Sequence, residues 1–255
     1  MVDIEKAIKE LLEDLVLPPD ILATGKGENP RNVTGRLEHS LLTAGLTLEA
    51  LREECRMARD LRIAVVCVAP YYVAEAVSFL AGSEVLVCAA VGFPGAFIST
   101  QAKAADVQAC VMLGAKQVDV AINIAAIKSG CFFEAENDFL SAVRAAGERA
   151  DVKAVFEHGS YDDAEKRAVL EMIGRSGVPF VKIQNMTSGH GARVEDIQLV
   201  RSVLGDRIKI KIDGGVKTLA QARELLESGA NRIGLTATMA VAEEERKEGK
   251  PEWTK

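Results

Sequence analysis

Hydrophobic and polar positions along the chain follow two alternating spacings. Short runs rich in valine, isoleucine and leucine recur from residue 36 onward. The stretches between them place apolar residues three and four positions apart, as in an amphipathic helix, whereas the short runs are typical of buried strands. The strands expected from this pattern cover residues 36–41, 63–68, 85–91, 117–122, 153–156, 179–183, 208–212 and 231–235.

Helices are expected between these strands, over residues 48–60, 72–80, 100–113, 135–149, 164–176, 194–204 and 219–228. Eight strands separated by helices predict parallel βαβ units, because parallel strands need long crossover connections. A closed (β/α)8 barrel, the TIM barrel, is favoured over an open doubly wound sheet. The chain length of 255 residues agrees with that choice, since such barrels typically have about 250 residues.

One domain is expected over residues 1–255. Apolar residues at helical spacing over 3–16, followed by Pro18 and Pro19, predict an extra helix within an N-terminal extension of residues 1–32. Residues 241–255 are expected to form a charged tail that is frayed or partly helical.

Composition narrows the range of functions. Hydrophobic residues make up 48% of the chain, the net charge is −6, and no basic stretch is interleaved with aromatic residues. These features disfavour nucleic-acid binding, and no apolar run approaches the roughly 20 residues of a membrane helix. The first residues alternate charged and apolar side chains, unlike a signal peptide. Because the five cysteines form no Cys-x-x-Cys pair, we expect reduced thiols in a cytoplasmic protein.

Three charged residues, Asp119, Lys182 and Lys211, interrupt strands that are otherwise apolar. Charged side chains are almost never fully buried unless they are paired, so a polar pocket explains these residues better than packing does. The active sites of TIM barrels lie at the face where the strands end. The sequence therefore predicts that the three residues belong to a pocket at that face.

Two neighbouring lysines suit the chemistry of a carbonyl group. An amine attacks a carbonyl only when it is unprotonated, and a free lysine with a pKa near ~10.4 is almost entirely ammonium at neutral pH. Burial and a second positive charge both lower that pKa, so one lysine would be the nucleophile, the other would tune it, and Asp119 would move protons. The alternative is that Lys211 points outward with Lys209, which lies on the same face of the strand, and pairs with helix carboxylates.

The turn after the seventh strand has features of an anion site. Gly214 and Gly215 precede Lys217, and a helix begins near residue 219. Free backbone amides at a helix N-terminus favour an anion, and TIM barrels often hold a substrate phosphate after strands 7 and 8.

A metal-dependent lyase or hydrolase is a second hypothesis. His39, His158 and His190 fall at or beyond strand ends, and Glu38 and Glu157 stand beside two of them. Imidazoles and carboxylates are ligands of divalent metals. The chain contains no His-Glu-x-x-His or His-x-His pattern, and strand-end histidines also serve as hydrogen-bonding walls of a pocket. We therefore expect no metal and no cofactor.

Seven segments resemble the deoxyribose-phosphate aldolase family in the same order and at the same spacing, from about residue 37 to residue 240. They are LEHSLL (37–42), VCVAPYYV (66–73), VGFPGAFISTQAK (91–103), QVDVAINIAAIKSG (117–130), FVK (180–182), KIDGGVKT (211–218) and GANRIG (229–234). The resemblance implies that Lys182 forms a Schiff base, that Lys211 lowers its pKa and that Asp119 acts in proton transfer. Glu38 stands where the family usually has the aspartate of an Asp-His-Thr motif.

The same resemblance implies that the substrate phosphate binds at Gly214, Gly215 and Lys217. Gly234 and Thr236, at the last strand, would complete this site. This chain departs from the family there. Residues 183–186 read Ile-Gln-Asn-Met where the family has Thr-Ser-Thr-Gly, and residues 234–238 read Gly-Leu-Thr-Ala-Thr where it has Gly-Thr-Ser-Ser-Gly.

Asp213 is a further departure from the family, which commonly has a small residue at this position. A carboxylate at position 213 would repel phosphate and could raise the pKa of Lys211.

The resemblance thus implies a class I aldolase, a carbon–carbon lyase of carbohydrate metabolism, with deoxyribose 5-phosphate as its default substrate. It implies a homodimer or homotetramer that binds a small aldehyde or sugar phosphate. Binding to nucleic acid or to a membrane is not expected. Three alternatives stay open: an aldolase of this family acting on a different or unphosphorylated sugar, the metal-dependent lyase, and a non-catalytic sugar-binding descendant.

Overall fold

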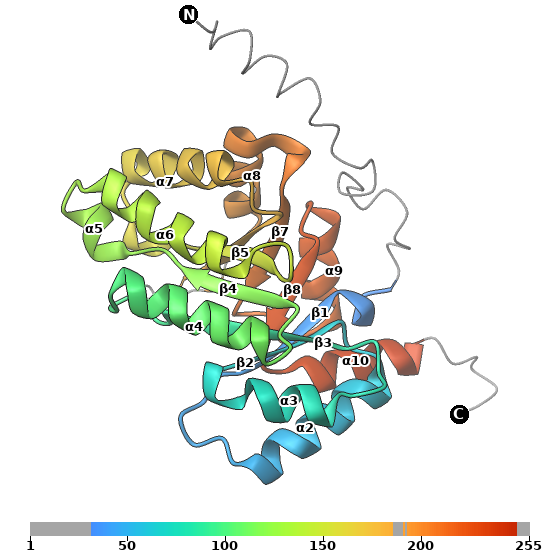
Figure 1. Cartoon of the computed structure of the whole chain (residues 1–255). Coiled ribbons are helices and arrows are strands. Elements are labelled where there is room, and N and C mark those ends of the chain that lie inside the picture. Colours follow the sequence, from blue (N-terminus) through green and yellow to red (C-terminus); the bar gives the residue numbers. More distant parts are fainter. Residues whose placement is uncertain (1–31, 186–190, 192, 249–255) are drawn as a thin grey trace, which may run out of the picture.

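Eight parallel strands close into a barrel in the order β1 to β8, as a computed structural model of the chain shows (Figure 1). The structure describes residues 32–185, 191 and 193–248. The TIM barrel predicted from the sequence is therefore confirmed. The strands are β1 (Leu37–Leu41), β2 (Val65–Val68), β3 (Leu86–Val91), β4 (Gln117–Ala121), β5 (Asp151–Glu157), β6 (Phe180–Gln184), β7 (Lys209–Asp213) and β8 (Arg232–Leu235).

Helices surround the barrel (Figure 1). Several begin at a side chain that accepts a backbone hydrogen bond, as Thr47, Ser99 and Asp162 do, which satisfies amides that have no partner within the helix. The helices are α2 (Leu48–Leu61), α3 (Val73–Phe79), α4 (Thr100–Met112), α5 (Ile124–Lys128), α6 (Phe132–Ala146), α7 (Asp163–Ser176), α8 (Val194–Leu204), α9 (Leu219–Glu227) and α10 (Thr238–Glu248).

One helix, α5, was not predicted, and α10 extends into the charged tail that was expected to be frayed or partly helical. The short α5 follows β4, and the tail is helical as far as Glu248. The helix predicted over 3–16 and the rest of the tail lie outside the described residues. Within the described part of the chain, no helix is long and apolar enough to cross a membrane.

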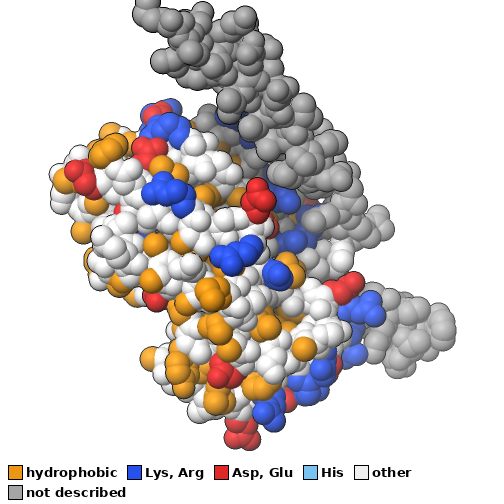
Figure 2. All heavy atoms as spheres, in the orientation of Figure 1, with side chains coloured by type: hydrophobic (Ala, Val, Ile, Leu, Met, Phe, Trp, Pro, Cys, Tyr) orange, Lys and Arg blue, Asp and Glu red, His pale blue; other side chains and the backbone are white. Residues whose placement is uncertain are grey.

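Each strand presents alternate residues to the barrel interior and to the surrounding helices. The main hydrophobic core lies between the strands and the helices, whereas a small apolar cluster of Val65, Cys67, Cys88 and Ala90 lies apart from it. On the face drawn in Figure 2, charged side chains gather along the edge over α2 and α10. The outer surfaces of these helices are polar, so both contact the barrel through their apolar sides.

The start of β1 is tied to α10 by one carboxylate. Glu245 accepts hydrogen bonds from the backbone amides of Val33 and Thr34, both at 2.8 Å, and from the Thr34 hydroxyl at 2.6 Å. Because these residues precede β1, the contact lies at the N-terminal face of the barrel, opposite the face where the strands end.

Candidate active site

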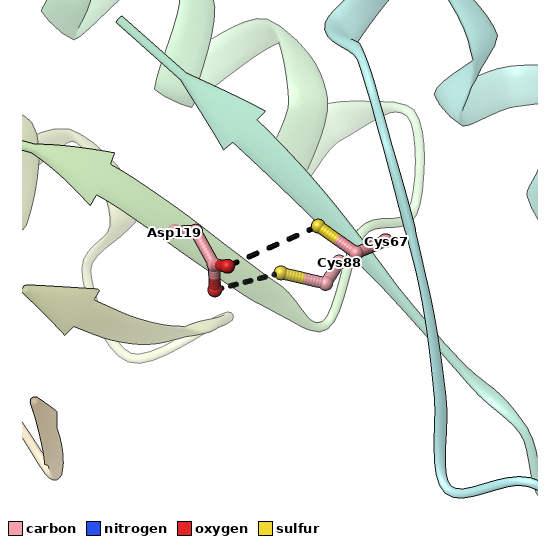
Figure 3. Close-up of side chains that lie close together, drawn as sticks. All are labelled: Cys67, Cys88 and Asp119. Carbon is pink, nitrogen blue, oxygen red and sulfur yellow. Dashed lines mark hydrogen bonds between the residues drawn. The ribbon is translucent and has the colours of Figure 1, made fainter. Parts of the chain in front are cut away.

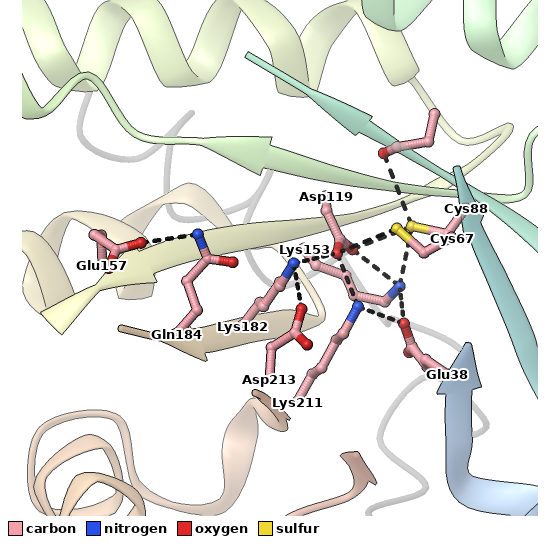
Figure 4. Close-up of polar contacts among 11 residues, drawn as sticks. Glu38, Cys67, Cys88, Asp119, Lys153, Glu157, Lys182, Gln184, Lys211 and Asp213 are labelled. Carbon is pink, nitrogen blue, oxygen red and sulfur yellow. Dashed lines mark hydrogen bonds and ion pairs between the residues drawn. The ribbon is translucent and has the colours of Figure 1, made fainter. Parts of the chain in front are cut away.

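The barrel interior holds three lysines and three carboxylates in one cluster (Figure 4). They come from five strands and are Glu38 (β1), Asp119 (β4), Lys153 (β5), Lys182 (β6), Lys211 and Asp213 (β7). The three lysine side chains and Glu38 are fully buried, and Asp119 is 2% exposed. Three positive and three negative charges make the cluster neutral, which is what allows so many ionised groups to be buried.

Lys182 and Lys211 are neighbours because β6 and β7 pair in a register that places them side by side. Asp119 faces both amines from β4. Its Oδ2 atom lies 2.8 Å from Nζ of Lys211 and 3.1 Å from Nζ of Lys182. The structure thus brings together the three residues that the sequence marked out, and Lys211 points inward, which removes the alternative in which it faces the helices.

Lys153 is a fourth member of this group that the sequence did not single out. Its Nζ lies 3.1 Å from Oε2 of Glu38 and 3.1 Å from Oδ1 of Asp119. It is the register partner of Asp119 on the adjacent strand. A charged residue near the start of an apolar strand was the available signal, by the same argument that selected Lys182.

Asp213, the last residue of β7, lies beside the amine of Lys182 (Figure 4). Its Oδ2 is 2.6 Å from Nζ of Lys182. The pair has the distance of an ion pair without the angles of a hydrogen bond, and we treat it as an ion pair. The sequence had connected Asp213 with Lys211, but its close partner is Lys182. Gly234 makes room for it, since a Cβ atom at Gly234 would lie 2.7 Å from Oδ1 of Asp213.

The carboxylates decide the protonation state of Lys182. Burial alone lowers the pKa of this lysine and Lys211 lowers it further, but Asp213 and Asp119 outweigh both and hold the pKa above its ordinary value. Lys211 thus contributes in the expected direction, but the expectation that the pKa of Lys182 is lowered overall is wrong. The physical reason is that Lys182 lies beside two carboxylates, Asp213 and Asp119.

Asp119 is ionised for the opposite reason. Burial by itself raises the pKa of a carboxyl group, but Lys153, Lys211 and Lys182 hold the pKa of Asp119 well below its usual value. Lys153 and Lys211 likewise outweigh burial and keep the pKa of Glu38 below its usual value. The positive charges of the buried lysines therefore keep both interior carboxyl groups ionised.

A cavity of about 420 Å³ opens above the cluster. Of the predicted binding residues, Asp213, Gly214, Gly215 and Thr236 line it. Its lining also includes Phe93, whose ring centre is 5.9 Å from Nζ of Lys182. Lys182 itself is fully buried, so Asp213 and Phe93 lie between the amine and the cavity.

Three backbone amides between the turn after β7 and the start of α9 already have partners within the chain. The amides of Lys217 and Thr218 donate to Oε1 of Gln221 at 2.8 and 3.3 Å, and the amide of Leu219 donates to Oε2 of Glu244 at 3.0 Å. The expectation of free amides is wrong for these three groups. The Lys217 side chain is exposed and is not part of the cavity lining.

Two thiols face Asp119 from β2 and β3 (Figure 3). Sγ of Cys88 lies 3.1 Å from Oδ1 of Asp119, and Sγ of Cys67 lies 3.9 Å from Oδ2. The two sulfur atoms and the Asp119 carboxylate lie close enough together to hold a metal ion. However, Lys153 Nζ is 3.4 Å from Cys88 Sγ, and burial holds the pKa of the Cys88 thiol well above its ordinary value. A cation would have to displace an ammonium group and deprotonate a resistant thiol.

The histidines of the metal hypothesis occupy separate places. His39 points away from the interior and hydrogen-bonds Glu54 of α2 at 2.9 Å and Thr238 of α10 at 3.0 Å. His158 pairs with Asp196 of α8 at 3.1 Å. Among the residues that the structure describes, neither joins a group of ligand atoms close enough to hold an ion. Glu157 accepts a hydrogen bond from Gln184, and His190 lies outside the described residues.

Several known proteins are similar to this chain in sequence or in fold. A family model described as histidine biosynthesis protein matches residues 145–248. A deoxyribose-phosphate aldolase of Halalkalibacterium halodurans is 34% identical over 220 residues, which cover 86% of this chain and 98% of that protein. Among solved structures, the aldolase QR15 has a TM-score of 0.80 at 28% identity and covers 85% of this chain and 97% of its own. The deoxyribose phosphate aldolase of Aeropyrum pernix, described as a unique tetramer, has a TM-score of 0.77 at 22% identity, with 90% and 98% covered.

Proposed function

This chain belongs to the deoxyribose-phosphate aldolase family and is a carbon–carbon lyase, and we propose that it works as a class I aldolase through a Schiff base on Lys182. One observation carries the assignment of the nucleophile. Lys182 is fully buried beside a second lysine, and both amines lie within about 3 Å of one carboxylate, Asp119. A buried amine beside a carboxylate that accepts protons suits imine chemistry better than structural pairing at a surface.

The first step is activation of Lys182. Its ammonium group gives a proton to a carboxylate, either Asp213 at 2.6 Å or Asp119 at 3.1 Å. The free amine then attacks the substrate carbonyl to form a carbinolamine. The carboxyl group returns its proton to the carbinolamine hydroxyl, and loss of water leaves a protonated imine and an ionised carboxylate. No external oxidant or metal enters this sequence, because the imine itself withdraws electrons.

In the cleavage direction, the bond between the second and third carbons of the substrate breaks. Its electron pair moves into the imine to form an enamine, while the hydroxyl proton on the third carbon passes through water to Asp119. An aldehyde leaves as the acceptor half. Protonation of the enamine carbon and hydrolysis then release acetaldehyde and restore Lys182.

Lys211 and Lys153 keep Asp119 in place for these transfers. Each donates a hydrogen bond to it, at 2.8 and 3.1 Å. They also connect Asp119 with Glu38, which both lysines contact. We assign Lys211 and Lys153 as positioning residues that fix the charge and direction of the proton carrier.

Borohydride trapping tests the nucleophile. Reduction of the protein with acetaldehyde should attach one two-carbon adduct to Lys182, as located by peptide mass spectrometry. Lys182→Met should abolish both the adduct and turnover, whereas Lys209→Met, which changes another lysine of the barrel interior, should retain both. Turnover should persist in a strong chelator. Absence of any adduct in the wild type, or an adduct that survives Lys182→Met, would overturn the assignment.

Deoxyribose 5-phosphate is the reference substrate, because the relatives are named for it. We propose that the chain cleaves a 2-deoxy sugar of this kind in the cytoplasm and assembles as a homodimer or homotetramer. Light scattering on the purified protein measures the assembly directly. A monomer across a broad concentration range would contradict that part of the proposal.

A further inference from the structure

The cavity above Lys182 has an unusual charge for a site that would hold a phosphate. We propose that its acceptor end takes an unphosphorylated hydroxyaldehyde and that Asp213 determines this specificity; the inference rests on the aldolase function proposed above. The substrate class is then a 2-deoxy sugar without phosphate, in equilibrium with acetaldehyde and an uncharged hydroxyaldehyde.

The first argument is the charge of the lining. Asp213 is the only ionisable side chain among the described residues that line the 420 Å³ cavity, and it is an anion. A phosphate ester carries close to two negative charges at neutral pH. During the enamine stage Lys182 is uncharged, so the carboxylate then faces the cavity without its partner. A phosphate bound nearby would be repelled at that stage, and juxtaposed like charges weaken binding strongly.

The second argument is the state of the turn after β7. The amides of residues 217–219 at the start of α9 already bond to Gln221 and Glu244. Glu244 also adds a carboxylate where a bound anion would need positive potential. These groups cannot serve a phosphate without first leaving their present partners.

The third argument is the space above that turn. The backbone at Gly191 lies directly on the backbone of the turn, because a Cβ atom on Gly191 would lie 2.7 Å from both the Gly214 oxygen and the Gly215 Cα. The chain's own backbone therefore packs against Gly214 and Gly215 and takes up space on one side of the turn. Only glycines at both positions permit this contact.

The groups that do face the cavity suit hydroxyls. Ser40, Thr43, Gln184 and Thr236 bring neutral donors and acceptors to it. Oγ of Ser40 is buried and has no hydrogen-bond partner among the described residues. A buried hydroxyl without a partner costs free energy until a ligand satisfies it, which is the property expected of a group that binds a substrate hydroxyl.

One basic residue competes with this interpretation. Arg193 lines an adjoining cavity of about 340 Å³ that shares Gly191 and Gly215 with the first. Glu195 and Glu224 line the same cavity, so its charge is negative as a whole. Arg193 is the described side chain best placed to bind a phosphate on the substrate, and the experiment therefore includes it.

The test compares kcat/KM for cleavage of 2-deoxyribose and 2-deoxyribose 5-phosphate by the full-length protein. The wild type should prefer the unphosphorylated sugar. Asp213→Ser should shift the ratio toward the phosphate ester by at least about tenfold. Glu227→Gln, which removes an exposed carboxylate of α9 that lines neither cavity, should leave the ratio unchanged. The ratio is informative even if Asp213→Ser slows the common steps at Lys182, because both substrates share them.

Two results would overturn the inference. One is a wild-type preference of tenfold or more for the phosphate ester, especially one that Arg193→Gln abolishes. The other is a ratio that Asp213→Ser leaves unchanged. If Asp213→Ser does not fold, inorganic phosphate replaces it as a probe of the wild type: it should not compete with 2-deoxyribose, and competitive inhibition would count against the inference.

Failure of this inference is distinguishable from failure of the aldolase assignment. Acetaldehyde has no phosphate, so borohydride trapping on Lys182 tests the nucleophile alone. An adduct on Lys182 together with a preference for the phosphate ester would refute only the acceptor specificity. Loss of the adduct would refute the mechanism on which the inference rests.

Discussion

Asp213 lies 2.6 Å from the amine of Lys182 and, together with Asp119, holds the pKa of this lysine above its ordinary value. A lysine that forms a Schiff base must lose its proton first, and here the group that stabilises the proton is also placed to accept it. The neutral balance of three lysines and three carboxylates makes this internal transfer inexpensive, because the proton moves within the cluster and creates no net buried charge.

Lys153→Met should destabilise the fold more than a surface substitution does. It leaves Glu38 and Asp119 buried with one cation fewer, and breaking a buried ion pair on one side costs about 3–5 kcal/mol. Urea denaturation measures the change in the free energy of unfolding. Lys166→Met is the control, because Lys166 pairs with the exposed Asp163 and such pairs are worth about 1 kcal/mol or less.

Combining Lys153→Met with Glu38→Gln should cost less than the sum of the two single changes, since both remove members of one network. Additive free energies would show that Lys153 and Glu38 are not coupled.

Stability should fall at acid pH and stay level from about pH 5 to pH 10. The pKa values of Glu38, Asp119 and Asp213 are lowered in the folded protein. Their contribution is therefore present above the unfolded value near ~4 and is lost as the pH falls through the folded value. The pKa values of Lys153 and Lys182 are raised in the folded protein, so these lysines stabilise the fold at lower pH and lose this effect as the pH rises. Their contribution is complete below the unfolded value of ~10.4 and is lost only at still higher pH.

Thermal unfolding between pH 2 and pH 8 checks this window. Asp119→Asn should lower stability at pH 7 and flatten the decline between pH 5 and pH 3. An unchanged acid slope in this variant would show that other carboxylates control acid unfolding.

Gly234→Ala should impair activity. An added Cβ atom would lie 2.7 Å from Oδ1 of Asp213 and 2.9 Å from Cε of Lys211, so both side chains must shift. Because displacements of about 1 Å in an active site can cost roughly a hundredfold in rate, we expect a fall in kcat of that order. Gly45→Ala is the control, since a Cβ atom there meets nothing within 4 Å. Equal activity of the two variants would contradict the prediction.

Glu245→Ala should lower stability but not the activity of the folded protein. The variant loses the three hydrogen bonds that Glu245 accepts from Val33 and Thr34, at a cost of about 1–3 kcal/mol for donors left unpaired. Glu243→Ala, which breaks only an exposed pair with Arg246, should cost less. Urea midpoints and kcat, measured together, separate the two effects. A large fall in kcat at full folding would contradict the placement of this contact at the face opposite the site.

The pattern of apolar residues was enough to predict the barrel. Each strand is buried on both faces and therefore appears in the sequence as a short apolar run between two helices. The pattern was less specific where burial is slight. Helix α10 buries only Thr238, Val241 and Ala242, so its charged sequence resembles a tail. His39 also could not be placed, because it points outward only by virtue of its position in β1, next to the inward-facing Glu38.

The sequence by itself determined the fold class, the strand positions and the candidacy of Asp119, Lys182 and Lys211, since each follows from residue type and spacing along one segment. The family also follows from the order of the motifs. Only the tertiary structure decided that Lys153 joins them, that Asp213 pairs with Lys182, and that the amides of residues 217–219 are already occupied. The first two features depend on strand register and barrel closure, which bring residues of different strands to about 3 Å from one another. The third depends on the capping of α9 by Gln221 and on its contact with Glu244 of α10. The charge on an ionisable group is then set by all of its neighbours together, and no single segment contains them.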